Sequence, residues 1–152
     1  MQELNYEQLV NEIIGRLEKE ENIVFATSAG NIVSARTMCH VNDGITIMFS
    51  TNGQSGKVEQ IKKNPNVALV VGDVQVEATA ELYGPPSKHE LFVAINDKKF
   101  PWMKDAFQPS PDGIDDGMLI ICHPIKISVY RYLDGKPHWD VLLATEKKAF
   151  RA

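Results

Sequence analysis

The stretch FSTNGQSGKVEQIKKNPNVALVV, from Phe49 to Val71, passes from an apolar strand through a polar loop into a short helix and a second strand. Val58 and Ile61 predict the helix by their spacing, and Pro65 ends it because proline cannot continue a helix. Hydroxyl groups, glycines and Lys57 meet where the helix begins, and the unpaired N–H groups of a helix N-terminus favour an anion. The loop therefore predicts either an anion site or a polar turn with a capping serine.

The glycine spacing of this loop excludes the common nucleotide motifs. A P-loop has four residues between its glycines and a Ser or Thr after the lysine. Here two residues separate Gly53 from Gly56, and Val58 follows Lys57. A dinucleotide-binding G-x-G-x-x-G that opens a helix is absent as well.

The remaining sequence predicts a mainly β fold. Short alternating runs separated by Gly, Asn, Asp and Pro are typical of a small antiparallel barrel or sandwich. Asp73 separates two runs that form either one bent strand or a tight hairpin, and the Pro- and Gly-rich residues 108–117 predict a surface loop. The chain shows no linker, so we expect a single domain over residues 1–152. The predicted strands are 22–28, 31–40, 45–51, 67–71, 74–82, 118–123, 125–132 and 138–143, and the predicted helices are 6–17, 56–64, 87–95 and 102–107.

Composition excludes several function classes. The net charge of -4 provides no positive field for nucleic acid. No apolar run reaches the ~20 residues that span a bilayer, and the N-terminus lacks the features of a signal peptide. We therefore expect a cytoplasmic protein that does not bind membranes.

Two Cys-His dipeptides, Cys39-His40 and Cys122-His123, suggest a metal site at first sight. Neighbouring residues on a strand point to opposite faces, so neither dipeptide can chelate one ion without a bulge. No C-x-x-C motif occurs, and we predict no metal ligand.

Five segments, in order, resemble the FMN-binding split-barrel family of the pyridoxamine 5'-phosphate oxidase type, in its short members similar to nitroimidazole reductases and general stress proteins. They are IVFATS, SARTM, MFSTN with Ser55 and Lys57 after it, KKNPNVALVV and VQVEATAEL, all between Ile23 and Leu82. The resemblance implies a six-stranded antiparallel split barrel with flanking helices. It also implies a homodimer with FMN in two equivalent grooves at the interface.

The resemblance also implies which residues bind FMN. Arg36, Thr37 and Met38 would line the isoalloxazine ring, and Phe49, Ser50 and Thr51 would continue that wall. Gln75 would reach the ribityl chain or the phosphate, and Trp102 is the candidate for a tryptophan that packs near the flavin from the second subunit. The loop residues Ser55, Gly56 and Lys57 would form the phosphate site.

The chain departs from the family pattern at two points. Pyridoxamine phosphate oxidases carry an Arg directly before the phosphate Lys, whereas this chain has Gly56. Arg36 or a residue of the partner chain is the expected substitute. Those oxidases also end in an Arg-rich tail that holds the substrate phosphate, but this chain ends in ATEKKAFRA, which argues against vitamin B6 oxidation.

The sequence leaves two functions open, and a third, an empty barrel used as an interaction module, is suggested only by the missing phosphate arginine. The first is an FMN-dependent oxidoreductase that passes electrons from NADH or NADPH to a small acceptor, with the cofactor carrying the chemistry and no catalytic side chain. The second is a protein that binds, stores or senses flavin, haem or a deazaflavin without turnover, because the matched segment lacks an obvious acid-base group.

Overall fold

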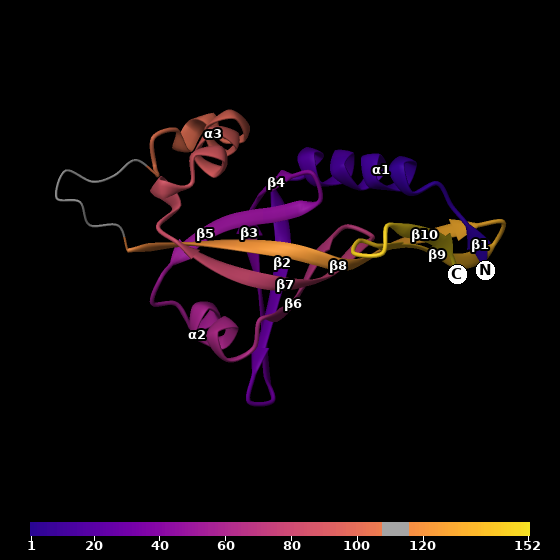
Figure 1. The fold of residues 1–152 in the computed structure, drawn as a ribbon, viewed down its shortest axis with the longest axis horizontal. Coiled ribbons are helices and arrows are strands. Elements are labelled where there is room, and N and C mark those ends of the chain that lie inside the picture. Colours follow the sequence, from indigo (N-terminus) through magenta and orange to yellow (C-terminus); the bar gives the residue numbers. More distant parts are fainter. Residues whose placement is uncertain (108–115) are drawn as a thin grey trace.

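The computed structural model describes residues 1–107 and 116–152, and its mainly β architecture confirms the predicted fold class. Antiparallel strands form the body, with α1 and α3 on one side of them and α2 on the other, beside the β2–β3 hairpin (Figure 1). The helices are α1 Tyr6–Lys19, α2 Gly56–Lys63 and α3 Glu90–Lys99, with 3-10 turns η1 Pro86–Lys88 and η2 Pro101–Met103. The strands are β1 Gln2–Glu3, β2 Asn22–Ala29, β3 Ile32–Cys39, β4 Val41–Asp43, β5 Thr46–Asn52, β6 Asn66–Val71, β7 Val74–Gly84, β8 Gly117–Leu133, β9 Lys136–Leu143 and β10 Lys148–Arg151.

The strand pairing closes into a barrel with one gap. β2 pairs with β3, and after His40 the same run of chain continues as β4, which pairs with β5. β5 pairs with β8, β8 with β7, β7 with β6, and β6 returns to β2. Within the described residues, β3 itself has no strand partner on its second edge. We call the opening between β3 and the β5–α2 segment the split.

The α1 helix forms as its amphipathic pattern predicts. The Asn5 side chain accepts a hydrogen bond from the Gln8 backbone N–H at 3.0 Å, which caps the first turn. Leu9, Ile13 and Leu17 are buried and pack into the main core inside the barrel. No helix in the part of the chain described here is both long and apolar enough to cross a membrane.

Two strand predictions are refined by the structure. β6 and β7 form a tight hairpin rather than one bent strand, because Gly72 at φ +57 permits a two-residue turn between Val71 and Val74. The predicted strands on either side of Pro124 are one strand, β8. A register shift opposite Ala78 places Pro124 at an irregularity of the ladder, where the missing proline N–H does little harm.

Two helix predictions are wrong at their boundaries. The predicted Ser87 cap lies in η1, and α3 begins later with His89 as its cap, whose Nδ1 accepts from the Phe92 N–H at 3.0 Å. The helix predicted at 102–107 is only the 3-10 turn η2 followed by a turn, since Asp105 at φ +70 is incompatible with a helix. Most of the predicted surface loop at 108–117 lies outside the described residues.

Ion pairs connect the C-terminal strands to α1. The buried carboxylate of Asp140 accepts hydrogen bonds from Arg131 and Arg151, both at 2.7 Å, and Arg131 also donates to Glu12 on α1 at 2.7 Å. The Arg151 guanidinium, followed by Arg131, holds the pKa of Asp140 below its ordinary value. Arg151 is thus occupied within the fold.

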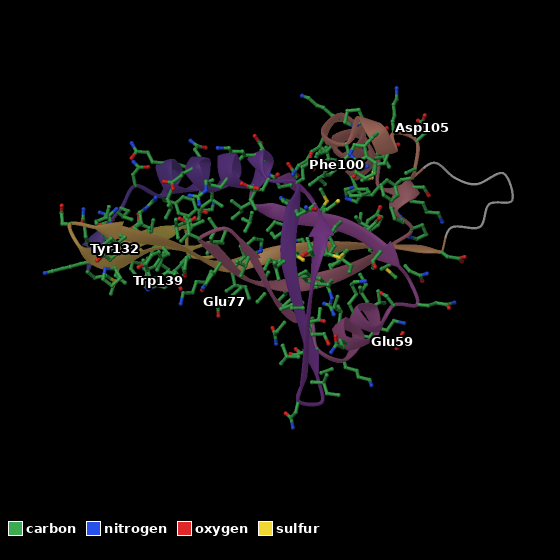
Figure 2. All side chains as sticks on the ribbon, turned by 180° about the vertical axis from the view of Figure 1, so that it is seen from behind. Glu59, Glu77, Phe100, Asp105, Tyr132 and Trp139 are labelled. Atoms are coloured by element: carbon green, nitrogen blue, oxygen red, sulfur yellow. The ribbon has the colours of Figure 1, made fainter. Side chains whose placement is uncertain are left out.

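One face of the sheet lies outside the barrel, and we call it the outer face. Figure 2 shows Glu77 and Trp139 on this side, whereas Phe100 lies on the opposite side, beside α3. Directly paired residues share a face of a sheet, so the register defines its rows. One row is Thr37, Val24, Val70, Gln75, Ser128 and Val141, and a second is Ala35, Ala26, Ala68, Glu77, Lys126 and Leu143.

Candidate anion site in the split of the barrel

A pocket of about 480 Å³ lies in the split. Ser34 and Arg36 line it from β3, and Gly56, Lys57 and Gln60 line it from α2. The loop that was expected to hold an anion therefore lies opposite the arginine-bearing strand. The two cationic side chains reach this pocket from different walls.

Arg36 is held in place from β2. Its Nη1 donates to Thr27 Oγ1 at 2.8 Å and to the Phe25 carbonyl at 3.3 Å, and its guanidinium carbon lies 5.8 Å from the centre of the Phe25 ring. The cross-strand pairing of Phe25 with Arg36 puts both side chains on the same face. Burial lowers the pKa of Arg36 from its ordinary value.

Lys57 is oriented by the strand before the loop. Its Nζ donates to Thr51 Oγ1 at 2.6 Å. Burial, followed by the charge of Arg36, lowers the pKa of Lys57. Neither Arg36 nor Lys57 takes part in a salt bridge among the described residues, and the nearby carboxylate of Glu59 pairs with Lys62 at 3.2 Å. Two close cations without a carboxylate partner favour an anion between them.

The start of α2 adds further donors. Ser55 occupies the cap position, but its side chain makes no capping hydrogen bond, and its buried Oγ has no hydrogen-bond partner among residues 1–107 and 116–152. A buried hydroxyl without a partner is costly, so a ligand atom at this point would relieve the cost. A Cβ atom added at Gly56 would meet no described atom within 4 Å. The residues present therefore fit a phosphate group.

The residues predicted to line the flavin ring differ in which of their groups can face the split. Phe49 is buried in the core, where its ring centre lies 4.7 Å from that of Phe25 in an edge-to-face contact, so only its backbone can face the split. Thr51 is half-buried and engages Lys57, and Ser50 is half-buried beside it. Met38 is half-buried against the core, whereas Thr37 is exposed on the outer face.

Two predicted residues lie apart from the split within one chain. Gln75 lies on the outer face and lines a different pocket of about 330 Å³ with Lys126, Ser128 and Trp139. Trp102 is 72% exposed on η2, where it makes an edge contact with Phe100 at 6.1 Å between ring centres. α3, which precedes η2, lies on the opposite side of the strands from α2 (Figure 1).

Three residues of the site were not predicted from the sequence: Ser34, Thr27 and Gln60. Gln60 lies one helical turn after Lys57, and Ser34 lies two residues before Arg36, so both spacings place them on the same face as a predicted ligand. Thr27 is a polar residue at a core-facing position of β2, where alternation favours an apolar side chain.

The two Cys-His dipeptides behave as strand alternation predicts. Cys39 is exposed while His40 is buried, with its Nε2 3.0 Å from the Leu17 carbonyl. Burial, followed by the charge of Lys99, lowers the pKa of His40 to about 4. Cys122 is buried, whereas His123 is exposed and lies 2.8 Å from Glu81. Among the described residues, no group of three or more His, Cys, Asp or Glu side chains could hold a metal ion.

Solved structures share this fold at low identity. A protein related to general stress protein 26 from Clostridium acetobutylicum is 20% identical over 93% of this chain and 98% of its own, with a TM-score of 0.64. A pyridoxamine 5'-phosphate oxidase-related, FMN binding protein from Nostoc punctiforme PCC 73102 is 14% identical over 100% of this chain and 98% of its own, with a TM-score of 0.66. HutZ, the heme storage protein from Vibrio cholerae, is 16% identical over 80% of this chain and 91% of its own, with a TM-score of 0.58.

At these identities the solved structures establish the fold alone. A comparison with curated proteins finds no match. The family model described as pyridoxamine 5'-phosphate oxidase matches residues 9–127, which is more than half of the chain and includes both walls of the split. The chain therefore belongs to the pyridoxamine 5'-phosphate oxidase family.

Proposed function

We propose that the protein binds FMN, with the cofactor phosphate in the split. The observation that carries this proposal is that Arg36 and Lys57 line one pocket and have no carboxylate partner among the described residues. Ser55, next to the lining residue Gly56, adds a hydroxyl that has no hydrogen-bond partner in the same part of the chain. A dianionic phosphate supplies the negative charge and the acceptor oxygens that these groups lack. Arg36 would thereby substitute for the family arginine that is Gly56 in this chain.

The protein side of the site would bind and orient the cofactor. Lys57, held by Thr51, and Arg36, held by Thr27, would fix the phosphate. The unpaired edge of β3 offers backbone N–H and C=O groups to the polar edge of a flavin ring. When bound, FMN supplies hydride and electron transfer, which no protein side chain provides. We propose a small oxidoreductase that takes electrons from NADH or NADPH and reduces a small acceptor.

We further propose that two copies pair through the outer face. Val24, Val70 and Trp139 remain 42%, 38% and 37% exposed there, which is unusual for side chains of this size. Glu77 and Lys126 lie side by side on this face. A two-fold axis through the face would let Glu77 of one copy pair with Lys126 of the other copy. Gln75 of one copy would then reach the cofactor in the other copy.

The test of FMN binding compares FMN with riboflavin, which has the same ring system but no phosphate. We expect the purified protein to retain a visible flavin spectrum after loading with FMN and desalting, and to retain riboflavin much less. Equal retention of both, or of neither, would contradict a phosphate site. Steady-state oxidation of NADH or NADPH by the FMN-loaded protein then tests the oxidoreductase.

A second candidate function is cofactor binding without turnover. The observation that favours it is that the described residues that line the split include no carboxylate, imidazole or thiol, which leaves the Lys57 amine as the one candidate acid-base group among them. The haem-storage role stated for HutZ is an example of storage on this fold. FMN retention without any oxidation of NADH or NADPH, with quinone, nitroaromatic or oxygen acceptors, would support storage or sensing. A spectrum with a haem band and no flavin retention would support haem.

A further inference from the structure

Thr27 is a buried hydroxyl with an unusual set of partners. It is 2% exposed and lies on the same face of β2 as Ile23 and Phe25, which are core residues. Its Oγ1 is 2.8 Å from Arg36 Nη1 and 2.5 Å from Gln60 Oε1. One hydroxyl therefore contacts a residue from each wall of the split.

The direction of these hydrogen bonds follows from the chemistry of the three groups. A guanidinium can only donate, so the Thr27 oxygen accepts from Arg36. The hydroxyl proton is then free for Gln60 Oε1, which can only accept. The Gln60 amide nitrogen donates to the Ile32 carbonyl on β3 at 3.3 Å, which fixes the orientation of the amide. The chain of bonds runs from Arg36 through Thr27 and Gln60 to the backbone of β3.

Gln60 also connects this chain to Lys57. The two residues are one turn apart on α2 and line the same pocket. Because α2 is short, a hydrogen-bonded anchor at Gln60 restrains the position of its whole first turn. Arg36 and Lys57 carry like charges, and the charge of Arg36, after burial, lowers the pKa of Lys57, so some element must hold the two side chains close when no anion is bound.

We propose that Thr27 and Gln60 form a positioning bridge that holds the two cations at the separation that a phosphate-bearing cofactor requires. Thr27 is a positioning residue, since it touches Arg36 and Gln60 and acts through them. This inference rests on the proposed phosphate site and explains why a hydroxyl occupies a core-facing position. A residue at position 27 must both accept and donate, so serine can replace threonine, whereas valine cannot.

The experiment measures FMN and riboflavin affinities, by quenching of flavin fluorescence, for the full chain and for three variants. Thr27→Val keeps the shape and removes both hydrogen bonds, Thr27→Ser keeps both, and Gln60→Met removes the amide from the exposed end of the bridge. We expect Thr27→Val and Gln60→Met to weaken FMN binding about tenfold or more, as the loss of a hydrogen bond to a charged group does. Riboflavin binding should not change in these variants. Thr27→Ser should bind FMN with the affinity of the unaltered chain.

The outcomes separate this inference from the proposed function. If the unaltered chain does not prefer FMN to riboflavin, the phosphate site itself is wrong, and the bridge with it. If the unaltered chain prefers FMN and both Thr27→Val and Gln60→Met keep that preference, only the bridge is wrong. A parallel loss of riboflavin binding would show that Thr27 supports the fold rather than the phosphate, which also overturns the inference. Urea unfolding of each variant identifies any variant that does not fold. If Thr27→Val does not fold, the affinities of Gln60→Met decide the test.

Discussion

Lys57 Nζ lies 2.6 Å from Thr51 Oγ1, so a residue of the strand before the loop orients the cationic side chain that follows the loop. The residues between them form a compact turn, in which the Asn52 side chain accepts from the Gln54 N–H at 2.8 Å and the Asn52 carbonyl accepts from the Ser55 N–H at 3.1 Å. The ammonium group is consequently fixed at the split before any ligand arrives. A prepositioned cation loses little side-chain entropy on binding.

Replacement of Lys57 by methionine tests that cation directly. The variant keeps the length of the side chain and removes its charge, so FMN binding should weaken by about 1.5–3 kcal/mol, or roughly 10- to 150-fold. Riboflavin binding should remain as it was. The matched control is Lys62→Met on the same helix, where the lysine pairs with Glu59 away from the pocket. A similar loss of affinity in both variants would contradict a specific role for Lys57.

Replacement of Gly56 by arginine should strengthen FMN binding. Open space surrounds the position, and its backbone is not in the left-handed region, so the larger side chain costs little. A second charged donor at the start of α2 would add about 1.5 kcal/mol or more, roughly a tenfold gain in affinity. Gly56→Gln is the control for size without charge. Titration of FMN fluorescence measures the FMN affinity of the unaltered chain and of both variants. An unchanged affinity in Gly56→Arg would exclude position 56 from the phosphate site.

His40 should make the fold sensitive to acid. Its pKa in the folded protein is about 4, below the ordinary value of 6.5, so the unfolded chain binds the proton more readily. The contribution of neutral His40 to the free energy of unfolding is therefore fully present above pH 6.5. It decreases as the pH falls toward 4, by up to about 3 kcal/mol at 1.36 kcal/mol per pH unit.

The measurement for His40 is urea unfolding between pH 7 and pH 4. His40→Gln retains a donor that can reach the Leu17 carbonyl but has no titratable ring, so its stability should fall less over this range. Identical pH profiles for the two proteins would show that other groups cause the acid sensitivity.

The two thiols should differ sharply in reactivity. Cys39 is exposed, whereas Cys122 is buried, and burial raises the pKa of the Cys122 thiol far above its ordinary value. A maleimide reagent should therefore modify one cysteine in the native protein and both in urea. Mass spectrometry counts the adducts, and Cys39→Ser should abolish the native reaction. Rapid native labelling of Cys122 would mean that this part of β8 opens readily.

The outer face can be tested with a charge at its centre. Ala68 lies on β6 in the row with Glu77 and Lys126, and Ala68→Arg should convert a dimer into monomers in sedimentation at micromolar concentration. Asn11→Arg, at an exposed position of α1, adds the same charge elsewhere as a control. A monomeric unaltered protein would remove the basis for pairing through this face.

The fold was largely predictable because its signals are local. The stripe of α1, the two-residue alternation of β2 and β6, and Pro65 at the end of α2 each act within a few residues. The continuity of β8 through Pro124 was not predictable, because the register shift against β7 that tolerates the proline depends on a distant partner. β10 was missed for a similar reason, since its four residues become a strand by pairing with β9 and with β1 at the other end of the chain.

The candidate site was predictable in part. The loop with Ser55 and Lys57 carries its own chemistry, so the anion hypothesis followed from the sequence. The proximity of Arg36 to Lys57 was expected only from the family resemblance, because it depends on how β3 folds back across the split. Gln75 and Trp102 lie away from this pocket, and this placement likewise follows from the order of the strands in the sheet. The alternation of apolar and polar residues alone does not determine that order.

The ion pairs around Asp140 have a consequence for how the protein is made. Glu12 meets Arg131 across 119 positions of sequence, and Arg151 joins the same cluster from the final strand. Contacts between distant parts of a chain form late, since the loop that joins them must first close. On the ribosome, Glu12 would therefore wait for its ion-pair partner until Arg131 emerges, although the apolar face of α1 already has core partners in β2 and β5.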